Sequence, residues 1–192
     1  KYKGAYLLTG STKKQNINIS HTGTGRINSI YMRPMSLFES GDSIGTVSLA
    51  DLFEGKKIKV AKSKTSINDI AHYICRGGWP GSLELPAKEQ LLIPKDLLES
   101  IVSKDIDEVD GTKKDKEKIR KLIRSYARNI STLATSKTIY KDQENEGISI
   151  DYKTYETYTN ALQRLYIIEN IKAWSPAIRS ASTIRTSDKK QF

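Results

Sequence analysis

The sequence predicts a mixed α/β protein in which strands come first, a small helical region follows, and a winged helix-turn-helix comes last. Two short apolar runs near the N-terminus predict buried strands. Apolar residues at helical spacing over 115–134 predict an amphipathic helix, and two β-prone segments near the C-terminus predict a hairpin. Shifts in composition place the boundaries of three regions at 1–65, 66–105 and 106–192.

The first region is predicted to contribute buried strands to a parallel sheet. Gly4–Leu8 is a short apolar run that ends in the polar turn Thr9–Thr12, and Ile30–Met32 repeats the pattern before Pro34. Residues 41–65 have weak periodicity and many lysines. They are therefore expected to form a connection rich in loops.

The middle region is predicted to be helical. Ser66 and Asp69 form a capping-type start. One helical face, expected to be buried, then consists of Ile67, Ile70, Ala71 and Ile74. Gly77-Gly78 and Pro80 are expected to stop this helix, and a second helix is predicted from Lys95 through Val102.

The third region contains the clearest periodicity. Its stripe consists of Ile119, Leu122, Ile123, Tyr126, Ile130, Leu133 and Ala134. Ser136–Lys141 can add one or two helical turns, and a strong helix starts at Asp151, whose carboxylate can cap it. Residues 171–174 and 178–185 then predict two strands. The order helix, short helix, helix, hairpin is typical of a winged helix-turn-helix.

The charge of the chain favours an anionic partner. Its 32 basic and 22 acidic residues give +10, and the excess lies at the two ends: residues 1–65 carry 11 basic and 4 acidic groups, and residues 106–192 carry 17 and 12. Nucleic acids and nucleotide phosphates both fit this balance, and so does a Lys-rich exterior that serves solubility alone.

Composition excludes several other classes of protein. The single cysteine, Cys75, permits no internal disulfide, and the two histidines leave no Cys/His spacing for structural zinc. No window approaches the roughly 18 consecutive apolar residues of a membrane span. We therefore expect a cytoplasmic protein with no metal site and no membrane partner. Since the chain opens without a Met or a signal segment, it is expected to be an internal fragment.

Several long motifs follow one another in an order typical of one family. They are YLLTGST, HTGTGRI, MRPMSLFESG, YICRGGWPGS, the DI…VDG stretch at 105–111, RSYARNISTLA and AWSPAIRS…IRTS. They resemble prokaryotic AAA-type ATP-binding proteins, in which a P-loop ATPase domain precedes a C-terminal domain of unknown function of the DUF4143 type. The resemblance covers nearly all of the chain. It implies that residues 1–65 end a P-loop ATPase sheet and that residues 66–105 are lid-like.

The resemblance also implies that the chain holds only part of an ATPase, whose full-length form uses ATP and Mg as cofactors. No G-x-x-x-x-G-K-[ST] loop occurs in the sequence. We therefore expect this chain alone to be inactive and to bind ATP weakly or not at all. Its expected partners are the upstream ATPase half of the same protein and a second copy of itself, because an open strand edge promotes self-association.

Four residues are candidates for the nucleotide site. By resemblance to the sensor strand, Thr9 and Ser11 are catalytic candidates, although a polar turn that closes a strand is the alternative. Arg26, which follows two glycines, can stabilise phosphate charge or pair with a carboxylate at a sheet edge. Arg76 can contact nucleotide phosphate, but a tight Gly-Gly turn beside a buried Trp also explains its segment.

The acidic residues between 105 and 110 can be interpreted as a metal site or, in preference, as a solvated helix end. The candidates for nucleic-acid binding are basic side chains of the third region, which suit DNA phosphates. They are Lys153, Lys172, Arg179, Arg185, Lys189 and Lys190. Glu156 near them predicts weak discrimination between sequences. A packing or protein-interaction module is the alternative interpretation.

Overall fold

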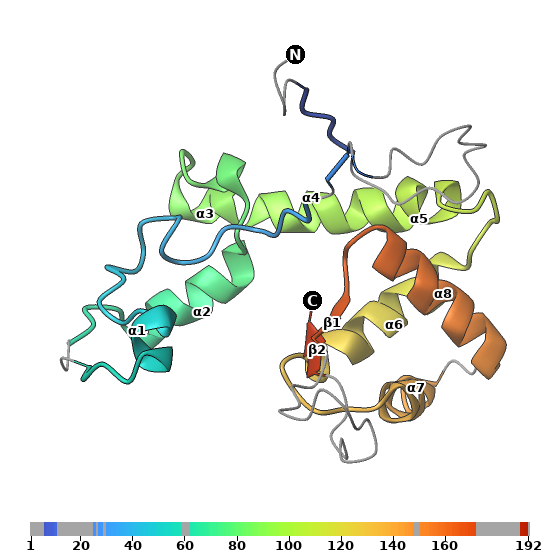
Figure 1. Cartoon of the computed structure of the whole chain (residues 1–192). Coiled ribbons are helices and arrows are strands. Elements are labelled where there is room, and N and C mark those ends of the chain that lie inside the picture. The colour runs from blue at the N-terminus through green and yellow to red at the C-terminus, as the bar shows by residue number, and fades with distance from the viewer. Residues whose placement is uncertain are drawn as a thin grey trace. The chain divides into compact units, whose positions relative to one another are not determined.

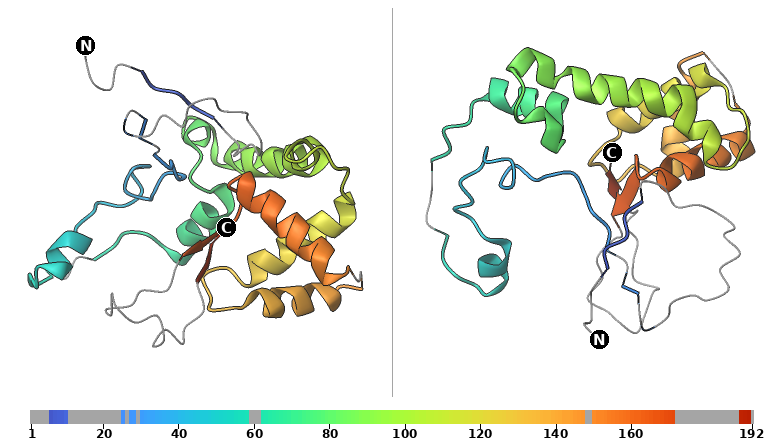
Figure 2. Two further views of the ribbon diagram at one scale, coloured as in Figure 1. Left: turned by 45° about the vertical axis from the view of Figure 1, so that its right-hand side comes forward. Right: turned by 90° about the horizontal axis from the view of Figure 1, so that it is seen from above.

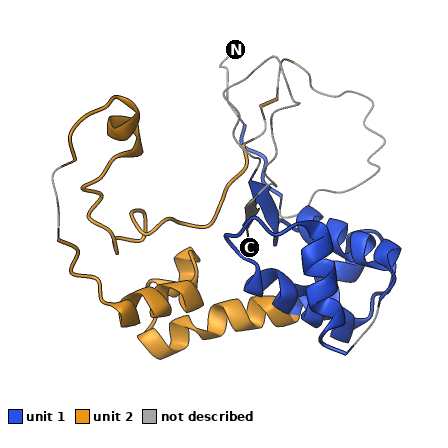
Figure 3. Ribbon diagram, turned by 90° about the horizontal axis from the view of Figure 1, so that it is seen from below, with its two compact units in different colours: residues 1–20, 100–192 blue, residues 21–99 orange. Residues whose placement is uncertain are grey.

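The computed structural model describes residues 6–10, 25, 27–28, 30–58, 62–147, 150–171 and 189–191. The chain divides into two compact units: unit 1 contains residues 1–20 and 100–192, and unit 2 contains residues 21–99 (Figure 3). The described part is mostly helical and contains one antiparallel pair of short strands (Figure 1). The prediction of an α/β protein built on the end of a P-loop sheet is therefore wrong.

The buried strands expected near the N-terminus are not present in the described residues. Tyr6, Leu7 and Leu8 are 92%, 87% and 84% exposed and lie outside any strand, and Ile30 and Met32 are equally open. A continuous apolar run becomes a buried strand only where neighbouring strands pair with it and other elements cover its two faces. Within the described ranges no such neighbours flank these runs, so the apolar pattern alone does not produce a sheet.

Unit 2 consists of short helices joined by irregular segments. They are α1 (Leu49–Phe53), α2 (Ile67–Arg76), the 3₁₀ turn η1 (Pro80–Ser82), α3 (Ala87–Gln90) and α4 (Leu92–Ser100), whose last residue belongs to unit 1. The start predicted for α2 is confirmed: Ser66 and Asp69 form a complete capping box. Its predicted stop is confirmed as well, because Gly77 caps the helix at φ 71°, a conformation that suits glycine.

The apolar face of α2 points outward, against expectation. Ile67 and Ile74 are 77% and 76% exposed, and Cys75 is exposed as well. On the other side of the helix, His72 bonds to Gln90 of α3 at 2.8 Å between Nε2 and Oε1. Among the described residues 30–99, no apolar side chain is buried. Polar contacts and caps hold these segments together, and the described part of unit 2 has no hydrophobic core of its own.

Unit 1 is a helical bundle followed by the strand pair (Figures 1 and 2). Its elements are the π-helical turn η2 (Ile101–Asp105), α5 (Ile106–Glu108), α6 (Lys116–Arg128), α7 (Ser136–Glu144), α8 (Tyr152–Arg164), β1 (Glu169–Ile171) and β2 (Lys189–Gln191). Helix α6 packs against α7, α8 and η2. In the antiparallel pair, Glu169 lies opposite Gln191 and Ile171 opposite Lys189.

The apolar core of the chain lies between these helices. Its most buried members are Val102, Ile106, Ile119, Leu122, Tyr126, Ile139, Tyr155 and Leu162. The stripe predicted over 115–134 is confirmed as far as Tyr126. It then stops, because α6 ends at Arg128 and Ser131 takes a positive φ of 58°, which turns the chain and leaves Leu133 60% exposed.

Candidate nucleic-acid interface

Helix α8 is anchored to the bundle along one side. Asp151 caps it by accepting a hydrogen bond of 3.0 Å from the backbone N–H of Thr154, as the sequence predicts. Tyr155, Tyr158 and Leu162 are buried on the bundle side. The Tyr158 hydroxyl also accepts a 3.0 Å bond from the backbone N–H of Asp115, the N-cap of α6. This packing fixes which side of α8 faces solvent.

The outer side of α8 is polar and exposed. Lys153, Glu156, Thr157 and Asn160 lie on it. The Thr157 hydroxyl donates a 3.0 Å bond to the backbone carbonyl of Lys153 and is therefore partly satisfied within the helix. Within the ranges that the structure describes, the Lys153 ammonium forms no salt bridge and is free to meet an anion.

Helix α7 is bound to α6 by a network of hydrogen bonds and ion pairs between charged and polar groups. Ser125 Oγ lies 2.8 Å from the backbone carbonyl oxygen of Ile139 and 2.8 Å from the Asp142 carboxylate, and its single O–H is shared between these two acceptors. Arg128 donates to the same carboxylate from Nε at 3.0 Å and from Nη2 at 2.8 Å, and its Nη1 bonds to Glu146. Burial disfavours ionisation of Asp142, but the bonds from Arg128 and Ser125 outweigh it and lower the pKa of Asp142.

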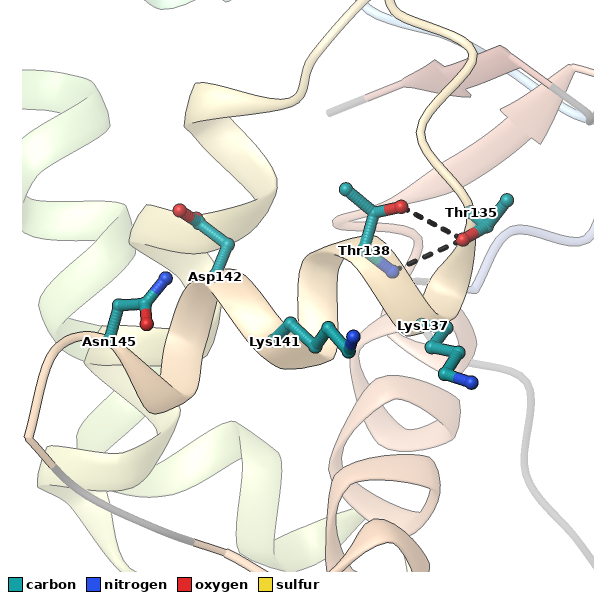
Figure 4. Close-up of a pocket in the computed structure, with 6 residues that line it drawn as sticks. All are labelled: Thr135, Lys137, Thr138, Lys141, Asp142 and Asn145. Atoms are coloured by element: carbon teal, nitrogen blue, oxygen red, sulfur yellow. Dashed lines mark hydrogen bonds between the residues drawn. The ribbon is translucent and has the colours of Figure 1, made fainter.

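A shallow hollow of about 430 Å³ runs along the outer side of α7 (Figure 4). It is lined by Thr135, Lys137, Thr138, Lys141, Asp142 and Asn145. Thr135 caps α7: its Oγ1 accepts a 3.1 Å bond from the backbone N–H of Thr138, and the two hydroxyls lie 2.9 Å apart. Lys137 and Lys141 are exposed, and neither ammonium has an ion-pair partner in the described part of the chain.

Sequence analysis did not single out Lys137 and Lys141. The signal for them was their spacing of four residues, which places them on one side of the short helix over 136–141. This spacing is a weak signal, because lysines are numerous in the chain and the excess of basic residues is more pronounced after residue 170.

Asp107 and Asp110, two of the acidic residues between 105 and 110, bind lysines. Lys114 Nζ, which is buried, bonds to Asp110 at 2.6 Å, and Lys116 bonds to Asp107. Burial disfavours ionisation of Asp110, but hydrogen bonds from Lys114 and Thr112 outweigh it and lower its pKa to about 2. Among the described residues no group of three or more His, Cys, Asp or Glu side chains could hold a metal ion.

Arg76, the nucleotide-binding candidate, is buried and paired. Its Nη2 bonds to Asp42 at 2.7 Å, and its guanidinium carbon lies 5.1 Å from the centre of the Tyr73 ring. The Arg76 hydrogen bond lowers the pKa of Asp42. Beside this pair, the Met35 backbone N–H donates a 2.9 Å bond to the Gly78 carbonyl, and a Cβ at position 78 would lie 2.3 Å from the Met35 oxygen. Arg76 therefore fastens residues 34–42 to the end of α2.

The remaining candidates are not brought together in the described part. Thr9 lies in an exposed segment without regular structure, while Ser11 and Arg26 lie outside the described residues. Lys172, Arg179 and Arg185 also lie outside them. Lys189 and Lys190 belong to β2, opposite Ile171 and Asn170 of β1.

The match to a known family includes the whole helical bundle. The family described as Domain of unknown function (DUF8612) matches residues 67–192, about two thirds of the chain. The chain belongs to the DUF8612 family. The DUF8612 match runs from the first residue of α2 past β2, so it includes α7, α8 and the strand pair. No curated protein and no solved structure matches the chain. In the described ranges, none of the helices has the length and apolar character that crossing a bilayer requires.

Proposed function

We propose that unit 1 is a nucleic-acid-binding module and that the outer side of α8, together with the β1–β2 pair, contacts the nucleic acid. The observation that carries the proposal is that α8 has one side buried in the bundle and an opposite side that is polar and exposed. Buried tyrosines and Leu162 fix the helix in the bundle, and Lys153, Thr157 and Asn160 face solvent. A helix fixed from behind, with polar side chains in front, can enter the major groove of a duplex.

The distribution of charge supports the same proposal. Residues 106–192 carry 17 basic and 12 acidic groups, and Lys189 and Lys190 lie in the strand pair that follows α8. Glu156 lies on the outer side of α8 and repels phosphates. The binding energy should therefore come from the sugar–phosphate backbone, with weak discrimination between base sequences. We place this activity in the cytoplasm, because a chain with one cysteine has no need of an oxidising compartment.

Fluorescence anisotropy with a labelled 20-base-pair duplex at several salt concentrations tests this function. With three to five phosphates contacted, the logarithm of affinity should fall with that of salt at a slope of roughly −3 to −4.5. Lys153→Gln should flatten the slope by about one unit, and the double variant Arg179→Ala, Arg185→Ala by about two. Lys113→Gln is a matched control, since Lys113 is exposed and belongs to neither α8 nor the strand pair. If the wild type does not bind at low salt, unit 1 is a packing or protein-interaction module.

An ATPase role of the full-length protein rests on the sequence motifs alone. The described residues do not fit ATP and Mg: Arg76 is engaged by Asp42, and Thr9 stands alone in an exposed segment. We therefore propose that ATP binding, where it occurs, depends on a phosphate-binding loop and an upstream half that the sequence does not contain.

A further inference from the structure

We propose that the outer ridge of α7, formed by Lys137 and Lys141, is a second phosphate-contacting surface, which binds the backbone of the same nucleic acid as α8. This inference rests on the proposed function of unit 1, and it assigns a binding role to two residues outside α8 and the strand pair. The ligand chemistry is that of neighbouring phosphodiesters on one strand.

The first support is that several cations of the bundle are already engaged by other groups of the bundle. Lys114 and Lys116 bind Asp110 and Asp107. Arg128 binds Asp142 and Glu146, and Lys121 donates a 2.9 Å bond to the Glu146 backbone carbonyl. Lys137 and Lys141 have no such partner in the described part of the chain. Unpaired lysines keep their full charge available for an incoming anion.

The second support is that two acidic side chains of this region are already engaged in hydrogen bonds and ion pairs. Asp142 lines the same hollow, but its carboxylate accepts bonds from Ser125 and Arg128, and Glu146 is paired with Arg128 as well. Arg128 is thus shared by two carboxylates and offsets one of their two negative charges. Glu144 is the exposed acid of α7, and burial together with the nearby Glu144 carboxylate raises the pKa of the Tyr140 hydroxyl. Its charge opposes binding at the far end of the ridge.

The third support is rigidity. Ile139, between the two lysines in sequence, is completely buried, and its carbonyl accepts the Ser125 hydrogen bond. The backbone that carries Lys137 and Lys141 is therefore fixed to α6. A spacing of four residues places the Cα atoms of the two lysines about 6 Å apart along the helix axis, slightly more than one turn of helix. Two cations on one fixed helix side can contact successive phosphates without ordering a loop, which lowers the entropic cost of binding.

The experiment compares Lys137→Gln, Lys141→Gln with Lys62→Gln, Lys64→Gln in the full chain. Both double variants lower the net charge from +10 by the same two units, and Lys62 and Lys64 are exposed lysines of unit 2. The probes are two 20-base-pair duplexes of unrelated sequence. The α7 variant should lose about tenfold in affinity at 50 mM salt on both duplexes and flatten the salt slope by about two units, while the unit 2 variant changes affinity by about twofold at most.

Two further variants show whether a loss of affinity comes from the removed charges or from a change in structure. Lys137→Arg, Lys141→Arg keeps both charges and should bind as the wild type does, and Glu144→Gln should bind more tightly because it removes a repelling carboxylate. If the wild type binds and the α7 and unit 2 double variants lose equal affinity, the ridge makes no contact and the inference is wrong, while the α8 proposal stands. If the wild type does not bind either duplex, the inference about the α7 ridge and the proposal about α8 are both wrong.

Discussion

Lys114 is the residue whose environment is most unusual for its type. Its side chain is buried, and its ammonium is satisfied by Asp110, by the Thr112 hydroxyl at 3.1 Å and by the Thr112 carbonyl at 3.1 Å. A buried charge is tolerated only when its hydrogen bonds are complete. The connection between α5 and α6 is therefore shaped around a lysine, and the carboxylate of Asp110 is the partner that makes this possible.

The Lys114–Asp110 pair should make the free energy of unfolding depend on pH in the acidic range. The pKa of Asp110 is about 2 in the folded protein and 3.8 ordinarily, so the stabilisation is complete above about pH 4 and is lost as the pH falls towards 2. The difference corresponds to about 2 kcal/mol. In urea unfolding at pH 7 and pH 3, Asp110→Asn should be less stable than the wild type at pH 7 and should lose less stability on acidification.

Glu117→Gln is the control for that comparison, because Glu117 is exposed and its removal should change the free energy of unfolding by about 0.5 kcal/mol or less. An Asp110→Asn variant that matches the wild type at pH 7 would show that Lys114 does not depend on this carboxylate.

At the scale of single elements, the caps decide where the helices of unit 1 begin. Asp115, Thr135 and Asp151 each accept hydrogen bonds from the first turn of α6, α7 and α8. Polar side chains at these positions compensate backbone N–H groups that have no partner inside the helix. Because α8 carries the proposed contact side, its cap also bears on function.

Asp151→Ala should lower the free energy of unfolding by about 1 kcal/mol, because it removes the acceptor for the Thr154 N–H. Asp151→Asn retains an acceptor of equal capping strength and should be close to the wild type. Thermal unfolding followed by circular dichroism measures both. Equal losses for the two variants would indicate that charge near the helix start, rather than the cap, supplies the stability.

The longer helices were predictable from sequence, whereas α1 and α3 were not predicted and the strands expected near the N-terminus are not present in the described residues. Caps and 3.6-residue periodicity act within one segment, so α2, α6, α7 and α8 could be recognised from their own residues. Strand formation at Tyr6–Leu8 depends on partners elsewhere, which no local pattern contains. The same distinction applies to the site. The outer side of α8 follows from its amphipathic pattern, whereas the engagement of Arg76 by Asp42, 34 residues away, depends on tertiary structure.

At the scale of the whole molecule, the chain should not bind ATP by itself. Most phosphate contacts in P-loop sites come from the Gly-rich loop and its lysine, neither of which the sequence contains. Isothermal titration calorimetry with ATP and Mg should give no heat of binding at micromolar concentrations. Micromolar affinity would show that the chain holds a phosphate site of another kind.

Among residues 30–58 and 62–99, which the structure describes, no apolar side chain is buried, and this has a consequence for how the protein opens. Burial of apolar surface is the main source of cooperativity, and a segment without it can open at a cost far below that of global unfolding. The amide protons of α2 should then exchange with solvent through brief local openings, while those of α6 exchange only when the bundle unfolds. The DUF8612 chain should thus combine a slowly exchanging bundle with a segment whose folded population depends on its caps, on the Arg76–Asp42 pair and on any apolar surface that contacts the isoleucines of α2.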